Sequence, residues 1–230
     1  MRKPFYNNEF FQSRVGEAYY SAFTILNIVR ENILIFDSVV DIGTGTGTWL
    51  KAAKDLGASK IKGYEGFLKD TNLLEIPSSC FEIHDLEKPI ENSSKFDLAL
   101  CLEVGEHIEN DSSKTLVSSI TNLSDNIIFS AAIPGQLGVG HINEQWPNFW
   151  ISLFSSKGYN CIDVIRPKIW TNSKIPFWYK QNCLFFSTDD SLAKSFMPNF
   201  ECQNLVHPEL YASKLENNDK SFFSKLRKFF

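Results

Sequence analysis

Three glycines alternate with threonines directly after a short β-branched run, and together they are the clearest candidate for ligand binding. The segment is Val40-Asp41-Ile42-Gly43-Thr44-Gly45-Thr46-Gly47. Glycine lacks the Cβ that would hold a ligand away from the backbone, so this turn can bring its N–H groups close to a bound molecule. Trp49 to Leu56 has a helical pattern closed by Gly57, and the positive end of that helix would face the same place. The pattern predicts a ligand-binding loop.

The spacing of the glycines separates two classes of cofactor. A dinucleotide fingerprint requires GxGxxG, and counted from Gly43 its last position is Thr48 rather than glycine. An NAD-dependent oxidoreductase is therefore disfavoured. A glycine-rich turn without any ligand is the remaining alternative.

Two acids follow at the ends of the next strand-like segments, Ile61 to Glu65 and Cys80 to His84. Glu65 lies about 20 residues beyond the loop, where a carboxylate can accept both hydroxyls of a ribose. Asp85 could accept from the exocyclic amine of adenine while the backbone N–H of Leu86 meets a ring nitrogen. The alternative for Asp85 is the N-cap of a helix.

A third group of ionisable residues comes directly after the apolar segment Phe96 to Leu102. It consists of Glu103, Glu106 and His107. We assign Glu103 to the cofactor side and His107 to the start of the next helix. A metal-dependent variant would draw its ligands from this group, but no ligand spacing in the sequence requires a metal, so none is predicted.

His141 lies on a loop with three glycines after the strand-like Asn126 to Ser130. A histidine can accept a proton near neutral pH, so His141 and His107 are the candidate catalytic bases. His141 is preferred because its glycines predict a mobile loop of close approach. Glu144 or Asn143 would orient the imidazole or bind an acceptor. Hydrogen-bonded core histidines are the alternative.

These residues need a scaffold that brings strand ends together. Strand-like segments alternate with helical ones, which predicts an α/β fold with a mostly parallel sheet covered on both faces. In such sheets ligands lie at the carboxyl ends of the strands. Further segments are expected to be a helix at Glu9 to Phe36, a helix at Pro147 to Lys157, and strands at Ser38 to Ile42, Cys161 to Ile165 and Cys183 to Ser187, the last two forming an edge hairpin.

With these motifs in place, residues 38–187 resemble the class I S-adenosylmethionine (SAM)-dependent methyltransferases. The glycine loop matches their DxGxGxG pattern, and residues 103–108 resemble the EVxEHI signature of their small-molecule branch. The resemblance implies a Rossmann-like, mostly parallel seven-stranded sheet with an antiparallel edge strand. It also implies SAM as methyl donor and S-adenosylhomocysteine (SAH) as product. Asp41 would orient the loop and reach the methionine part of the cofactor.

The resemblance extends to the acceptor side. His141 to Pro147 and Trp178 to Asn182 resemble a bacterial and viral subgroup often encoded beside glycan-assembly genes. An O-methyltransferase acting on a sugar hydroxyl is therefore expected, with a small molecule or glycan as acceptor. Aromatic side chains that could stack on a sugar ring, or simply pack, are Trp146, Phe149, Trp150, Trp170, Phe177, Trp178 and Tyr179. The alternatives are N- or carboxyl-methylation of a metabolite and a non-catalytic SAM-binding subunit.

Composition limits the class of partner and the compartment. The 230 residues carry a formal charge of −4 and no basic stripe, so no nucleic-acid partner is expected. The five cysteines show no CxxC spacing and no apolar leader precedes the domain, so a cytoplasmic location is expected. We expect a helical cap at 1–37, a SAM-binding domain at 38–190 and an extension at 191–230. Within the extension, Asp219 to Phe230 has a basic amphipathic pattern that suits a membrane surface or a partner. The sequence does not indicate an oligomeric state.

Overall fold

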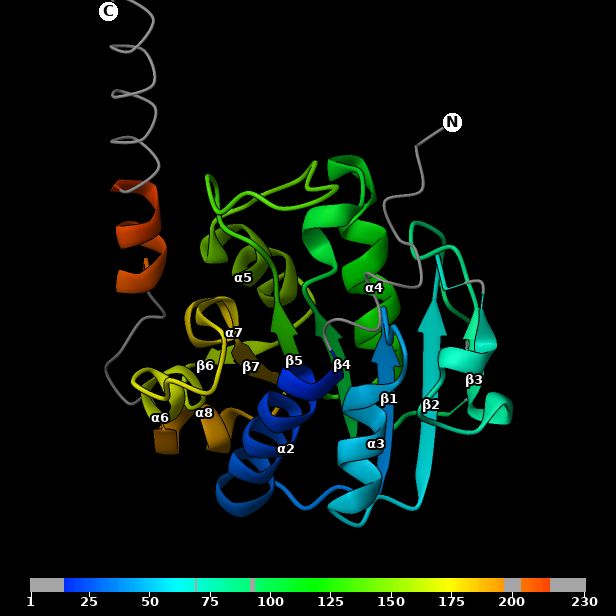
Figure 1. The fold of residues 1–230 in the computed structure, drawn as a ribbon. Coiled ribbons are helices and arrows are strands. Elements are labelled where there is room, and N and C mark those ends of the chain that lie inside the picture. The colour runs from blue at the N-terminus through cyan, green and yellow to red at the C-terminus, as the bar shows by residue number, and fades with distance from the viewer. Residues whose placement is uncertain (1–14, 69, 92–93, 197–203, 216–230) are drawn as a thin grey trace, which may run out of the picture.

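The computed structural model describes residues 15–68, 70–91, 94–196 and 204–215. Its centre is a seven-stranded sheet with strand order β3-β2-β1-β4-β5-β7-β6 (Figure 1). The strands are β1 (Ser38–Ile42), β2 (Lys60–Glu65), β3 (Phe81–Ile83), β4 (Leu98–Leu102), β5 (Asn126–Ser130), β6 (Asn160–Ile162) and β7 (Leu184–Ser187).

The sheet is mostly parallel, as expected. β1 pairs in parallel with β2 and β4, and the pairs β2–β3 and β4–β5 are also parallel. β7 is antiparallel both to β5 and to β6, so the expected antiparallel strand and edge hairpin are confirmed. Chain order reverses between β1 and β4, so the loops after these two strands diverge and leave room for a ligand between them.

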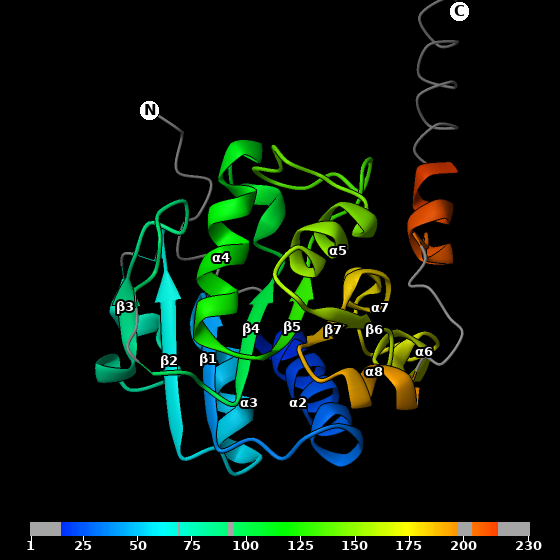
Figure 2. The ribbon, with the colours of Figure 1, turned by 180° about the vertical axis from the view of Figure 1, so that it is seen from behind.

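Helices cover both faces of the sheet (Figures 1 and 2). They are α2 (Val15–Asn32), α3 (Thr48–Asp55), α4 (Ser113–Leu123), α5 (Pro147–Ser155), α6 (Arg166–Ile169), α7 (Phe177–Asn182) and α8 (Asp190–Phe196). Because side chains alternate along a strand, β4 supplies Leu98 and Leu100 to the core under α2 and α3, and Ala99 and Cys101 to the core under α4 and α5. This double burial explains why the strands are continuously apolar.

Several expected element boundaries were wrong, and three of them concern the turn after β4 and the edges of the sheet. His107 does not begin a helix but lies in a 3-10 turn at Gly105–His107, and α4 begins only at Ser113. The strands expected at Cys80 to His84 and Cys161 to Ile165 are shorter, at Phe81–Ile83 and Asn160–Ile162. Both strands lie at an edge of the sheet and have a neighbouring strand on one side only, so fewer backbone hydrogen bonds are available to prolong them.

The ends of the chain are described only in part. The expected N-terminal helix is present as α2 but ends at Asn32 rather than Phe36, and residues 9–14 lie outside the described residues. The amphipathic segment at 219–230 also lies outside them. Among the residues that the structure describes, no helix is both long enough and apolar enough to cross a membrane.

Candidate active site

A cavity of about 1080 Å³ opens at the carboxyl ends of the strands, where chain order reverses. Loops after β1 to β5 and the start of α7 supply its walls. Nine of the residues expected at a site line it: Gly43, Thr44, Gly45, Glu65, Asp85, Leu86, Glu103, His107 and His141. Asp41, Gly47 and Glu144 lie behind this lining and support it.

The glycine loop has the backbone conformation that requires glycine. Gly43, Gly45 and Gly47 have φ angles of 81°, 54° and 86°, in the left-handed region. A Cβ on Gly43 would lie 2.2 Å from Cγ2 of Val104, and one on Gly47 would lie 2.7 Å from Cγ1 of Ile76. The loop therefore packs directly against the segment after β4, and larger residues would displace it.

Two buried carboxylates support this loop from the ends of β1 and β2. Asp41 is 2% exposed, and burial, with a further contribution from Glu65, raises its pKa to about 7. Burial also raises the pKa of Glu65. Its Oε2 accepts from the N–H of Gly45 at 2.9 Å, and its Oε1 accepts from the N–H of Phe67 at 2.8 Å. Glu65 thus links the glycine loop to the end of β2 and remains on the cavity wall.

Asp85 lies on the cavity wall in a turn after β3. Its Oδ1 accepts from the N–H of Glu87 at 3.1 Å, and Lys88 lies 3.4 Å from its Oδ2. No helix begins here, so the helix N-cap alternative is wrong. Its side chain is 55% exposed, which leaves the carboxylate accessible to a ligand.

Glu103 has a strained backbone at the end of β4. Its φ is 55°, uncommon for a residue with a side chain and frequent at functional sites. Its N–H donates to the carbonyl of Ser130 at 2.9 Å, and its Oε1 accepts from Nδ2 of Asn182 at 3.2 Å. Asn182 also donates to Gln136 at 3.1 Å. Neither Asn182 nor Gln136 was assigned a role from the sequence, because they meet Glu103 only through tertiary contacts.

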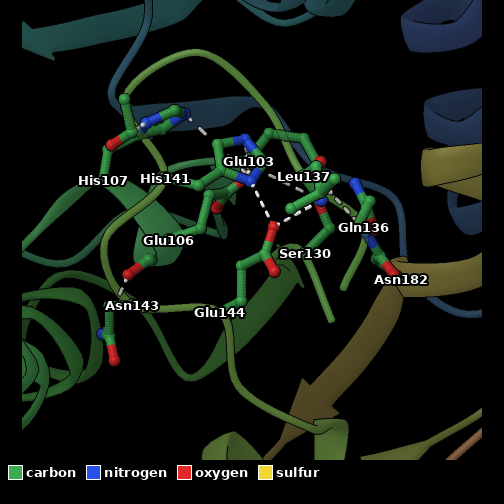
Figure 3. A network of polar contacts seen from close by, with 12 residues as sticks. Glu103, Glu106, His107, Ser130, Gln136, Leu137, His141, Asn143, Glu144 and Asn182 are labelled. Atoms are coloured by element: carbon green, nitrogen blue, oxygen red, sulfur yellow. Dashed lines mark hydrogen bonds and ion pairs between the residues drawn. The ribbon is translucent and has the colours of Figure 1, made fainter. Parts of the chain in front are cut away.

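The histidines expected to be bases lie together. The ring centroids of His107 and His141 are 4.9 Å apart, and Nε2 of each lies 4.0 Å from Oε1 of Glu106 (Figure 3). The backbone explains this meeting, since the carbonyl of Glu106 accepts from the N–H groups of Ile142 and Asn143 at 2.9 and 3.1 Å. The loop after β5 is thereby attached to the turn after β4.

Glu144, and not Asn143, orients the imidazole of His141. Nδ1 of His141 lies 2.8 Å from Oε1 of Glu144, which also accepts from the N–H of Leu137 at 2.6 Å. Asn143 is buried and donates to the carbonyl of Gly105 and to Oγ of Ser113, both at 3.1 Å. Asn143 therefore anchors the loop and does not face the cavity.

Within the loop that carries His141, Gly138 packs against the imidazole, whereas a Cβ on Gly135 would meet nothing within 4 Å. A Cβ on Gly138 would lie 2.2 Å from Nε2 of His141, so that position has no room for a side chain. Since Nδ1–H donates to Glu144, Nε2 carries the lone pair, on the side that faces Glu106. A lone pair at that position can accept a proton or bind a cation.

Glu106 was considered from the sequence only as a ligand of a metal-dependent variant, which was not the predicted one. It is fully buried, and neither carboxylate oxygen accepts a hydrogen bond from the described part of the chain. Burial and the neighbouring Glu103 raise its pKa well above the usual range. The ExxEH spacing was the only sequence signal for it, and that spacing does not reveal its closeness to His141.

The aromatic residues divide between the cavity and the core. Phe177, Trp178 and Tyr179 line the cavity beside Trp49, whose ring centroid lies 5.4 Å from that of Tyr179. Trp150 is instead 2% exposed in the core. The segment around α7 therefore supplies an aromatic wall to the cavity that the histidines also line.

Comparisons with known proteins give the family and the fold. A family model described as a methyltransferase domain matches residues 17–162. Curated protein sequences give no match. Among solved structures, DesVI from Streptomyces venezuelae is similar with a TM-score of 0.60 and 12% identity, over 79% of this chain and 96% of that one.

Two further solved structures share the fold. CalS10, an amino pentose methyltransferase from Micromonospora echinaspora, has a TM-score of 0.55 and 10% identity over 82% of this chain and 100% of that one. Magnesium protoporphyrin IX methyltransferase from Synechocystis with bound SAH has a TM-score of 0.51 and 15% identity over 75% and 84%. At these identities the likeness extends to the fold alone.

Proposed function

This chain belongs to the methyltransferase domain family, and on that premise we propose that it methylates a hydroxyl group of a sugar or a related small molecule. It is a SAM-dependent methyltransferase of the class I fold, with SAM as its cofactor. SAM supplies a methyl group on a sulfonium and leaves as SAH. The observation that carries the choice of a hydroxyl acceptor is His141, oriented by Glu144 with its lone pair at the cavity.

The residues around the cavity fit SAM. Two buried carboxylates beside a glycine-rich turn suit a ligand with hydroxyl and amino groups, because charged hydrogen bonds are the strong kind. We propose that Glu65 accepts the ribose hydroxyls and that Asp85 and the N–H of Leu86 meet adenine. The methionine part would lie along the loop and toward β4, near the remaining cofactor residues Asp41, Gly43, Thr44, Gly45, Gly47 and Glu103.

A hydroxyl acceptor needs a catalytic base to remove its proton. Amine and carboxylate acceptors depend less on such a base. We propose that Nε2 of His141 takes this proton while Glu144 stabilises the resulting imidazolium. His107 would support the turn beside it. Both imidazoles lie on the cavity wall, as does the loop at Gly43 to Gly45.

A sugar is the acceptor that we favour. The aromatic wall of Phe177 and Trp178 offers flat apolar faces to the C–H side of a sugar ring. CalS10, an amino pentose methyltransferase, has a similar fold. A porphyrin methyltransferase shares that fold too, so the aromatic wall, rather than the fold, supports a sugar.

We also keep the proposed division into a helical cap at 1–37, a SAM-binding domain at 38–190 and an extension at 191–230. The first boundary falls between the end of α2 at Asn32 and the start of β1 at Ser38, and α2 packs on the SAM-binding domain through Ala22 and Ile25. The free cysteines Cys101 and Cys183 are buried, which is consistent with a reducing compartment such as the cytoplasm.

Calorimetry and a methyl-transfer assay test the proposed function together. We expect SAM and SAH to bind the wild-type protein, and Gly45→Val to abolish binding because its side chain would extend into the cofactor space. Label from methyl-labelled SAM should then pass to free or nucleotide-linked sugars. Transfer only to amines or carboxylic acids would reassign the acceptor. SAH binding with no transfer to any acceptor class would indicate a non-catalytic SAM-binding subunit.

A further inference from the structure

Three potential metal ligands meet on the wall of the cavity. The ligand atoms of Glu106, His107 and His141 all lie within 4.8 Å of one another. They come from the turn after β4 and the loop after β5, and Figure 3 shows both imidazoles beside Glu106. We propose that these side chains bind a divalent transition-metal ion that holds and activates the acceptor hydroxyl. This inference rests on the proposed function and makes His141 a metal ligand when the ion is bound.

Glu106 supplies the first argument. Its side chain is 1% exposed, and neither oxygen accepts a hydrogen bond from the residues that the structure describes. A buried carboxylate is costly to ionise, and such groups in proteins are paired with a cation or coordinate a metal. The carboxylate of Glu103 lies nearby and adds a second potential negative charge. A cation between Glu106 and the imidazoles would balance the negative charge of these two carboxylates.

The orientation of the imidazoles supplies the second argument. Nδ1 of His141 is held by Glu144 at 2.8 Å, and Nδ1 of His107 lies 3.3 Å from the carbonyl of Gly140. Each ring therefore has its Nδ1 hydrogen directed at an oxygen and its Nε2 on the side of Glu106. Metal-binding histidines are oriented in this way, by a carboxylate or a backbone carbonyl on the nitrogen that does not bind the ion.

The distances require only small adjustments. Ligands at ~2.1 Å from one ion lie roughly 3–3.5 Å apart, whereas Nε2 of each histidine lies 4.0 Å from Oε1 of Glu106. Rotations of the side chains that move each ligand atom by less than ~1 Å would close the site. Three protein ligands leave coordination positions open, as in catalytic rather than structural metal sites.

The donor set selects the class of ion. Two imidazoles and one carboxylate suit Mn²⁺, Fe²⁺ or Zn²⁺ better than Mg²⁺ or Ca²⁺, which prefer oxygen ligands alone. Such an ion would act as a Lewis acid and lower the pKa of a hydroxyl bound to it, so that the hydroxyl would release its proton to water while Nε2 of His141 stays on the ion. A hydroxyl of the acceptor would occupy an open position beside the cofactor loop, which lines the same cavity.

Binding of Mn²⁺ to the full-length protein tests the site directly. After treatment with a chelator, titration followed by electron paramagnetic resonance should show one ion per chain. Glu106→Gln and His141→Asn should each weaken Mn²⁺ at least ~100-fold, and Glu144→Gln about 10- to 100-fold. His84→Asn, which removes an imidazole outside the cavity lining, is the matched control and should leave Mn²⁺ affinity unchanged.

A second measurement does not depend on the variants folding. Electron spin echo spectra of Mn²⁺ bound to the wild-type protein should contain ¹⁴N modulation from directly bound imidazole. Absence of that modulation, or Mn²⁺ affinity that is unchanged in Glu106→Gln protein still able to bind SAH, would overturn the site. No binding of Mn²⁺ or Zn²⁺ at millimolar concentration would overturn it as well.

A methyl-transfer assay distinguishes failure of the metal site from failure of the proposed function. We expect the chelated enzyme to bind SAH normally and to transfer methyl groups to sugars at least ~100-fold more slowly until Mn²⁺ or Zn²⁺ is restored. Full activity after complete metal removal would refute the metal site and leave the function standing. Tight metal binding without transfer to any hydroxyl would refute the acceptor and leave the metal site standing.

Discussion

Asp41 should destabilise the protein without cofactor at neutral pH, and Asp41→Asn should relieve this. Burial raises its pKa in the folded state to about 7, from 3.8 in the unfolded chain. The folded state therefore binds the proton more tightly, so the contribution of Asp41 to stability is complete below pH 3.8. It is lost as pH rises toward about 7. At ~1.4 kcal/mol per unit, the whole loss is about 4 kcal/mol.

Urea unfolding of the protein without cofactor, followed by tryptophan fluorescence at pH 5, 6, 7 and 8, measures this effect. Between pH 5 and pH 8, the free energy of unfolding of the wild type should fall by ~2–3 kcal/mol relative to that of Asp41→Asn, because most of the titration of Asp41 falls in that interval. Taking the difference between the two proteins removes the contributions of other buried acids. Asp111→Asn, at an exposed position outside the cavity lining, should follow wild type.

The same substitution should act in the opposite direction on the cofactor. Asp41 supports the glycine loop from below and would reach the methionine part of SAM, so Asp41→Asn should weaken SAH while it stabilises the protein without cofactor. A stability difference that does not change with pH, or that grows in favour of wild type as pH rises, would refute the reasoning. It would show that Asp41 is already ionised and compensated in the folded state.

Three further predictions concern the cofactor, the base and the tail. Glu65→Ala should cost ~2–3 kcal/mol of SAH affinity, or about 30- to 150-fold by calorimetry, and should also lower stability because the N–H groups of Gly45 and Phe67 lose their acceptor; unchanged affinity would place the ribose elsewhere. His141→Ala should lower kcat by ~10²–10⁴-fold with SAH affinity nearly unchanged, and His107→Ala should lower kcat less; the reverse order would exchange their roles. If the tail binds membranes, full-length protein should co-sediment with anionic liposomes and a chain truncated before Asp219 should not; equal behaviour would contradict this.

Most of the sheet was predictable because its signals are local. Ser38–Ile42 and Asn126–Ser130 are β-branched, apolar runs between turn residues, and both strands have the expected bounds. The glycine loop was predictable for the same reason, since its three glycines adopt positive φ angles that their sequence spacing suggests. Edge strands were less accurate, because their ends depend on neighbours that pair along one side only.

The acceptor side was predictable only in its parts. His107, His141 and Glu144 could each be chosen by residue type and by place after a strand. Their arrangement could not, because it depends on hydrogen bonds between the loop after β5 and the carbonyl of Glu106. Sequence patterns relate residues that are near one another in the chain. Glu106 and His141 lie on two different loops, which only the folded sheet brings together.

The end of β4 is difficult to explain by stability alone. Glu103 has a positive φ, which costs about 1 kcal/mol or more, and Glu106 is buried with no hydrogen bond to its oxygens from the described residues. Glutamine or an apolar residue at position 106 would fill the same space without burying a carboxylate. Both costly features face one cavity together with His107 and His141. Because a fold alone gains nothing from this arrangement, a bound ligand or ion is the simplest explanation for the concentration of ionisable groups there.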